Sequence, residues 1–164
     1  SRRENSAEHS WHLALYALTL ADHVPEGVSI DRVIRMLLLH DLVEIDVGDV
    51  PIHSANGTAH ASEATAKAEQ QAATRIFGLL PPDIAAQFHA LWDEFEAAAT
   101  PDAIFAKSLD RVQPVMANLA AGGGTWAEYN VTFDQLETRV GMKIARGAPR
   151  LWDWVREKTL PWFT

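Results

Sequence analysis

Cysteine is absent from the 164 residues, and basic residues are few, with 14 Lys and Arg against 22 Asp and Glu. The first absence excludes disulfide bonds, thiolate metal sites and cysteine nucleophiles, so any metal must be held by His, Asp and Glu. The second, a formal net charge of -8, excludes the broad basic field that binds long nucleic acids. A small anionic substrate would need local help from a metal or an arginine.

Long apolar runs are also lacking. No stretch of about eighteen uncharged apolar residues is present, and the chain has no signal-like start, so we expect neither a membrane partner nor export. A cytoplasmic location suits a chain without cysteine. The length of 164 residues and the 48% hydrophobic content predict one core, and therefore a single domain over residues 1–164.

Apolar residues recur at spacings of three and four almost throughout, which predicts an all-α fold. We expect helices over about 7–22, from a Ser29 cap through His40 and Asp41, over about 61–77, over about 82–98, from Thr100 to the glycines at 122–124, and from Pro149 onward. Residues 52–59 have the composition of a surface loop. Trp11, Leu15 and Leu18 form one apolar stripe, and capping boxes are predicted at Thr125–Glu128 and Thr132–Gln135.

His40 and Asp41 directly follow the apolar run 33–39. A carboxylate at the end of a buried helix must be paired or bound to a cation, because an isolated buried charge is costly. The two residues could form a simple hydrogen-bonded pair, or they could bind a divalent metal. Glu44 lies one helical turn further on, within reach as a general base, and Asp49 follows the flexible Gly48 at the mouth of the same site.

Further ligands must come from other helices. His9, near the start of the first helix, and Asp110, within the apolar part of a later one, are the best candidates. They would complete a set of two imidazoles and two carboxylates, which divalent ions accept. His12 is a rival to His9 one turn along the same face. His53 and His60 are more typical of solvated loop histidines than of ligands to a second metal.

The order and context of these residues resemble the HD-domain metal-dependent phosphohydrolases, and within them the YfbR-like 5'-deoxynucleotidase branch. The resemblance rests on residues 4–10 (ENSAEHS), 40–44 (HDLVE), 48–51 (GDVP) and 105–110 (FAKSLD). It implies an HD-domain helical bundle with the metal site between helices. It further implies these roles: metal ligands His9, His40, Asp41 and Asp110, a water-activating Glu44, and Asp49 as acid/base or as the group that holds the sugar hydroxyl.

In that branch an arginine upstream of the segment ENxxEHS also holds the phosphate, in a stretch that this sequence does not contain. Arg2 and Arg3 lie nearby without being equivalent. They are weak candidates for substrate binding, and the group that holds the phosphate is unassigned. Lys107 and Arg111 are the other basic residues close to the motifs.

The predicted function is a metal-dependent phosphohydrolase that releases phosphate from small nucleotides, 5'-(deoxy)nucleoside monophosphates above all. One divalent ion (Mn, Co, Fe, Mg, Zn or Ni) would be the cofactor, because His/carboxylate sets accept several metals. Two alternatives stay open: a hydrolase of another phosphorylated metabolite, such as a nucleoside di- or triphosphate or a ppGpp-type nucleotide, and a non-catalytic metal- or nucleotide-binding module. The late tryptophans (Trp126, Trp152, Trp154, Trp162) could pack a homodimer surface.

Overall fold

The structure is a computed structural model that describes residues 4–48 and 63–164. It confirms the all-α prediction, because the described ranges contain helices and turns but no strand. The elements are α1 (Ser6–Thr19), η1 (Ala21–His23), α2 (Ile30–Leu39), η2 (His40–Val43), α3 (Glu44–Val47), α4 (Glu63–Phe77), α5 (Pro82–Ala97), α6 (Pro101–Ala120), α7 (Thr125–Glu128), α8 (Phe133–Leu136), η5 (Glu137–Gly141), α9 (Met142–Gly147) and α10 (Pro149–Phe163).

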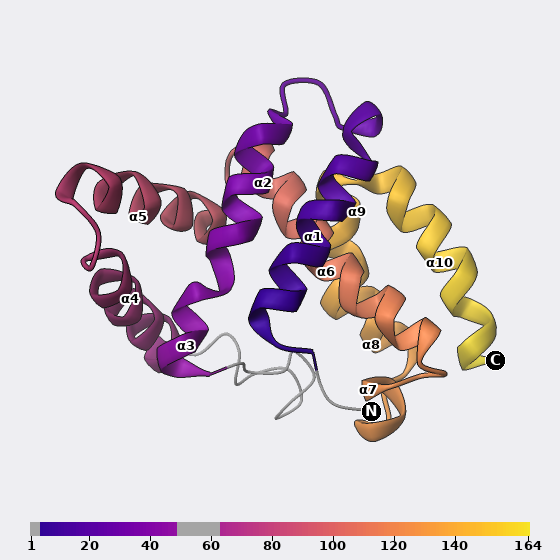
Figure 1. Cartoon of the computed structure of the whole chain (residues 1–164). Helices are drawn as coiled ribbons and strands as arrows, with labels where there is room; N and C mark the ends of the chain where they lie inside the picture. Colours follow the sequence, from indigo (N-terminus) through magenta and orange to yellow (C-terminus); the bar gives the residue numbers. More distant parts are fainter. Residues whose placement is uncertain (1–3, 49–62) are drawn as a thin grey trace.

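Helix α6 lies at the centre of the bundle (Figure 1). It contacts α1, α2, α5, α9 and α10, and its buried residues follow one another so closely that little of its middle faces solvent. Thr100 caps its start by accepting a hydrogen bond from the backbone N–H of Ala103, and Pro101 occupies the first turn, where no N–H is needed. Any polar side chain in the middle of α6 is therefore surrounded by other helices.

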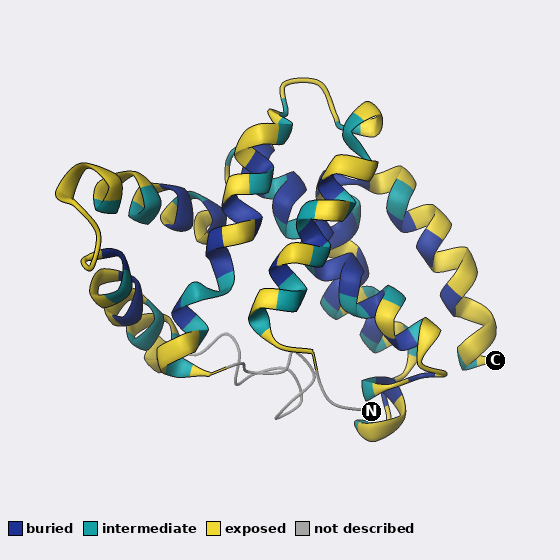
Figure 2. Cartoon of the chain, in the orientation of Figure 1, coloured by how far each residue is buried: buried dark blue, intermediate teal, exposed yellow. Residues whose placement is uncertain are grey.

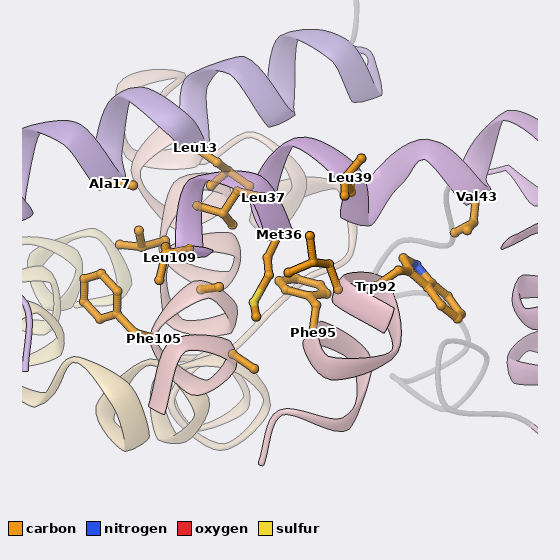
Figure 3. Packing of buried hydrophobic residues seen from close by; sticks show 14 of the residues in the cluster. Leu13, Ala17, Met36, Leu37, Leu39, Val43, Trp92, Phe95, Phe105 and Leu109 are labelled. Carbon is orange, nitrogen blue, oxygen red and sulfur yellow. The ribbon is translucent and has the colours of Figure 1, made fainter. Parts of the chain in front are cut away.

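Two apolar clusters pack against α6. Figure 2 shows the buried residues along α6 and along the helices that surround it. The first lies between α1, α2, α4, α5 and the first half of α6, and Figure 3 shows Leu13, Leu37, Phe95, Phe105 and Leu109 within it. The second joins the other half of α6 to the helices that follow it. No helix in the described part of the chain is long and apolar enough to cross a membrane.

The start of α2 is tied to α6 by a buried carboxylate. Asp102, in the first turn of α6, accepts a hydrogen bond from the backbone N–H of Ser29 at 2.7 Å. Its other oxygen lies 3.3 Å from Nε of Arg32, which also pairs with Glu94 on α5. Ser29 is indeed the N-cap of α2, but the capping acceptor comes from Asp102 rather than from the serine side chain. This contact fixes α2, and hence the segment that follows it, against α6.

The apolar stripe expected on α1 is not the buried one. Trp11, Leu15 and Leu18 are 62%, 38% and 58% exposed, whereas Leu13 and Ala17 are fully buried. Leu13 and Ala17 lie one helical turn apart on the face toward α2 and α6, and the small Ala17 permits close approach. Size complementarity with neighbouring helices, rather than the bulk of the side chains, decided which stripe is inside.

Helix α2 also ends earlier than predicted. It stops at Leu39, and His40 and Asp41 lie in the 3-10 turn η2 that follows. Of the two predicted capping boxes, the one at Thr132–Gln135 is confirmed. The one at Thr125–Glu128 is wrong, because Oδ1 of Asn118 accepts the hydrogen bond from the N–H of Thr125 and Gly124 is the N-cap. The predicted loop at 52–59 lies outside the described residues.

The late tryptophans divide between core and surface. Trp126 and Trp152 are buried in the second cluster, whereas Trp154 and Trp162 are 49% and 37% exposed. The ring of Trp162 packs against that of Trp126 at a centroid distance of 5.3 Å. Two of the four side chains are thus explained by the fold itself.

The contact between α6 and α9 depends on Gly147. A Cβ atom at this position would lie 2.6 Å from the carbonyl oxygen of Ile104 and also against Oγ of Ser108. We therefore expect Gly147→Ala to reduce the free energy of unfolding by about 1–3 kcal/mol, because the clash involves backbone that cannot rotate away. Urea denaturation measures the change. An unchanged midpoint with an unchanged slope would contradict this account of the helix contact.

Candidate metal centre

The structure brings His9, His40, Asp41 and Asp110 together at one place between α1, η2 and α6. Nε2 of His9 lies 3.2 Å from Oδ1 of Asp110, and Nε2 of His40 lies 3.6 Å from the same oxygen and 2.9 Å from Oδ1 of Asp41. One donor atom each from His9, His40 and Asp41 falls within 4.8 Å of the others. Four side chains from three separate stretches of sequence thus converge on one small space.

Local structure sets each of these positions. Asn5 and Glu8 form a capping box: Oδ1 of Asn5 accepts from the N–H of Glu8, and Oε2 of Glu8 accepts from the N–H of Asn5. This box fixes where α1 begins and places His9 one turn inside the helix. The first part of the ENxxEHS segment therefore has a structural role beside the ligand candidate that follows it.

Hydrogen bonds on the far side of both rings set which nitrogen faces the site. Nδ1 of His40 donates to the carbonyl oxygen of Leu37 at 2.8 Å. Nδ1 of His9 lies 3.1 Å from Oε1 of Gln113 and 3.3 Å from Glu4. In both cases the neutral tautomer with hydrogen on Nδ1 leaves the lone pair of Nε2 directed at the shared space, which is the arrangement of metal-binding histidines.

Gln113 is the residue that the sequence prediction missed. It is 1% exposed, and its amide Nε2 donates to both carboxylate oxygens of Glu4, at 3.0 and 2.9 Å. That pairing forces Oε1 toward His9. Nδ1 of His12 also lies 3.1 Å from Nε2 of Gln113, so His12 contacts the support of the site rather than the site itself. Gln113 lies three residues after Asp110 on a buried helix face, and this spacing is the sequence signal that could have indicated its role.

The charges of the four groups are strongly coupled. Burial lowers the pKa of His40, but the adjacent carboxylates of Asp110 and Asp41 outweigh burial and raise it to about 10. Burial acts against ionisation of Asp110, yet Arg111, His40 and His9 together hold its pKa well below its usual range. Without a cation, the raised pKa of His40 favours its charged form, which together with Arg111 balances the carboxylates.

A divalent cation fits this set. Nε2 of His40 is completely buried and, although it is close to Asp41, makes no well-aligned hydrogen bond to any described residue. A buried polar atom in this state is costly unless something else binds it. Two imidazole nitrogens and two carboxylates are ligands that divalent ions accept. Binding of such an ion would displace the proton of a charged histidine and leave the ring neutral.

Glu44 lies beside the four groups, at the first position of α3. Oγ of Ser6 donates a 2.7 Å hydrogen bond to its Oε2, which ties the start of α1 to this carboxylate. The neighbouring Asp46 pairs with Arg75 of α4, so α3 is held on its other side as well. Glu44 is thus positioned near the metal-binding groups by contacts of its own.

A cavity of about 600 Å3 opens onto the same groups and is lined by His9, His40, Asp41, Glu44 and Asp110 among others. Its size is within the range of pockets that bind small molecules. Asp49, Arg2 and Arg3, together with His53 and His60, lie outside the described residues.

The chain is similar to proteins of one family over nearly its whole length. The HD domain family model matches residues 1–152. The 5'-deoxynucleotidase HDDC2 of Homo sapiens is 30% identical over 115 residues, which are 70% of this chain and 53% of the human protein. The protein of the same name from Dictyostelium discoideum is 25% identical over 145 residues, 85% of this chain and 70% of that one. This chain spans about half the length of the human relative.

A solved structure is also similar. It is described as a predicted metal-dependent phosphohydrolase from Magnetospirillum magnetotacticum MS-1, is 46% identical, and superposes with a TM-score of 0.89 over 99% of this chain and 80% of that one. The fold, the convergence of His9, His40, Asp41 and Asp110, and the family match agree with one another. The chain belongs to the HD-domain family.

Proposed function

We propose that this protein is a metal-dependent phosphohydrolase that releases phosphate from small nucleotides, in the first place 5'-(deoxy)nucleoside monophosphates. The observation that carries the proposal is the convergence of His9, His40, Asp41 and Asp110 on one buried space, beside a further carboxylate and a cavity of substrate size. The relatives named 5'-deoxynucleotidase support the choice of substrate.

In this proposal His9, His40, Asp41 and Asp110 hold one divalent ion. Such an ion lowers the pKa of a bound water and polarises a phosphoryl oxygen, two effects that phosphomonoester hydrolysis needs at neutral pH. Which of Mn, Co, Fe, Mg, Zn or Ni is native is left open, because the ligand set accepts several.

Glu44 takes the proton of the attacking water. It lines the same cavity as the ligand set, and the hydrogen bond from Ser6 positions its carboxylate there. Asp49 is assigned the return of a proton to the leaving oxygen, or the binding of the sugar hydroxyl, by resemblance alone. Arg2 and Arg3 stay candidates for substrate binding because they lie near the same motif in the sequence, without being equivalent to the family's arginine.

Two alternatives remain beside this proposal. The same centre could hydrolyse another phosphorylated metabolite, and a phosphate-release screen across nucleoside mono-, di- and triphosphates tests the choice directly. A module that only binds metal or nucleotide would have no need of Glu44 held beside the ligands. The cytoplasmic location, the single domain and the homodimer likewise stay predictions from the sequence.

The role of Glu44 is tested by Glu44→Gln. We expect turnover of nucleoside monophosphates to fall about 10²- to 10⁴-fold, the usual contribution of a general base, while the metal content stays the same. Phosphate release and elemental analysis measure the two quantities. Asp153→Asn, on the exposed side of α10, is the matched control and should change neither. Unchanged turnover, or loss of the metal, would show that Glu44 is not the base.

The support of His9 is tested by Gln113→Met, which keeps the volume but removes the hydrogen bonds to His9, Glu4 and His12. We expect Mn2+ to bind about 10- to 100-fold more weakly, as happens when the outer hydrogen bond of a metal ligand is lost. Calorimetric titration of the metal-free protein measures this affinity. Gln87→Met, at an exposed position of α5, serves as the control. Equal Mn2+ affinities would mean that Gln113 only fills space.

Metal binding should depend on pH in a defined direction. In the metal-free protein the pKa of His40 is raised to about 10, and an ion must displace that proton because only the neutral ring is a ligand. Mn2+ affinity should therefore rise by up to about tenfold per pH unit as the pH increases toward about 10, where the ring loses its proton without the metal. Calorimetry in buffers of different ionisation enthalpy counts the protons released. Affinity that is flat over this range would contradict the assignment of His40 as a ligand.

A further inference from the structure

The described lining of the cavity is strongly acidic. It contains the six carboxylates of Glu4, Asp41, Glu44, Glu69, Glu96 and Asp110, and two cationic side chains, Lys107 and Arg111. A phosphate monoester brings almost two more negative charges into this space at neutral pH. One divalent ion balances only the two carboxylates among its ligands. Within the described lining, the positive charge that meets the substrate must therefore come from Lys107 and Arg111.

The two cations are presented by the same helix that carries Asp110. Lys107 and Arg111 are four residues apart on α6, so they lie one above the other on one face. Nε of Arg111 is 3.5 Å from Oδ2 of Asp110, which places the guanidinium directly beside a ligand candidate. Arg111 is 7% exposed, so its charge acts in a space from which most water is excluded.

Lys107 is held on the wall of the cavity by two contacts. Its Nζ donates to Oε1 of Glu96 at 2.8 Å and lies 4.0 Å above the centre of the Phe95 ring. The same Phe95 ring packs against the ring of His40, with centroids 4.8 Å apart. One aromatic side chain therefore joins the lysine to the metal-binding groups and limits how far its ammonium can move.

Neither contact alone requires a role in binding, since a lysine beside a glutamate is common. Two further observations favour such a role. Once Asp110 binds an ion, that ion balances its charge, and the buried guanidinium of Arg111 beside it still carries a positive charge at the wall of the cavity. The positive field of the two residues also reaches Lys143 on α9. Burial is the largest cause of the lowered pKa of Lys143, and the charges of Arg111 and Lys107 lower it further, whereas Asp110 raises it.

We propose that Lys107 and Arg111 form the phosphate-binding subsite of this cavity and bind the phosphoryl group of the substrate. This inference rests on the proposed function and deepens it. The phosphate exchanges the Lys107–Glu96 pair for a Lys107–phosphate pair, and Arg111 offers the planar fork that binds two phosphate oxygens. The subsite supplies the group for which Arg2 and Arg3 are only weak candidates.

The test uses inorganic phosphate as the probe, titrated into the Mn2+-loaded protein. We expect Lys107→Gln and Arg111→Gln each to raise the Kd for phosphate about tenfold, the effect of one lost charge-assisted hydrogen bond, and to leave the Mn2+ content unchanged. The KM for nucleoside monophosphates should rise with them. Lys158→Gln on α10, whose ammonium lies over Trp154 far along the chain, is the matched control and should leave both constants as they are.

Glu96→Gln separates a binding role from a structural one. It frees Lys107 from its partner, so phosphate should bind more tightly, whereas a purely structural ion pair predicts no gain. Arg111→Lys keeps the charge of a buried residue and removes the fork. It should show a smaller rise in the Kd for phosphate, and it replaces Arg111→Gln if that variant does not fold. An unchanged Kd in Lys107→Gln, or no gain in Glu96→Gln, would overturn the subsite.

Failure of the subsite and failure of the proposed function give different results. If the wild-type protein hydrolyses nucleotides but the variants bind phosphate as it does, the subsite is wrong and the function stands. If the wild-type protein releases no phosphate from any nucleotide, yet phosphate binding still depends on Lys107 and Arg111, the function is wrong and the anion subsite stands.

Discussion

A carboxylate enclosed by other helices in the middle of the central helix, with 15% of its side chain exposed, is the constraint around which this molecule is arranged. Asp110 lies on α6 where other helices surround it, and an ionised side chain in that position must be balanced by opposite charge. His9 from α1, His40 from η2 and Arg111 from α6 itself supply that charge, and each of them holds the pKa of Asp110 down. The same side chains therefore hold α1 and η2 against α6 and form the site.

The hydrogen bonds to the outer nitrogens of His40 and His9 orient both rings toward the site. Leu37 on one side and Gln113 with Glu4 on the other fix the tautomers of His40 and His9, so that the Nε2 atoms face each other across the space. The capping box of Asn5 and Glu8 and the bond from Ser6 to Glu44 bring the start of α1 to the same place. Much of residues 4–10 is thus explained by support of the site, and only His9 by direct participation.

Sequence reasoning reached the helical fold and the convergence of the ligand candidates because both depend on patterns that survive in one dimension. Apolar spacing indicates helices, and polar residues such as His40 and Asp110 stand out within apolar runs. It did not identify the buried stripe of α1. Leu13 and Ala17 are buried there, and Trp11 and Leu18 are exposed, because the smaller pair fits against the neighbouring helices. It also missed Gln113, because the partners that give this residue its role lie more than 100 residues away along the chain.

The distance along the chain between the ligand candidates has a consequence for folding. His9 and Asp110 are 101 residues apart, with His40 and Asp41 between them. An ion held by all four would act as a cross-link that closes two long loops, and its binding energy would be added to the stability of the native state alone. The ion would then have two roles: it would take part in the reaction, and it would hold α1 against the rest of the helices.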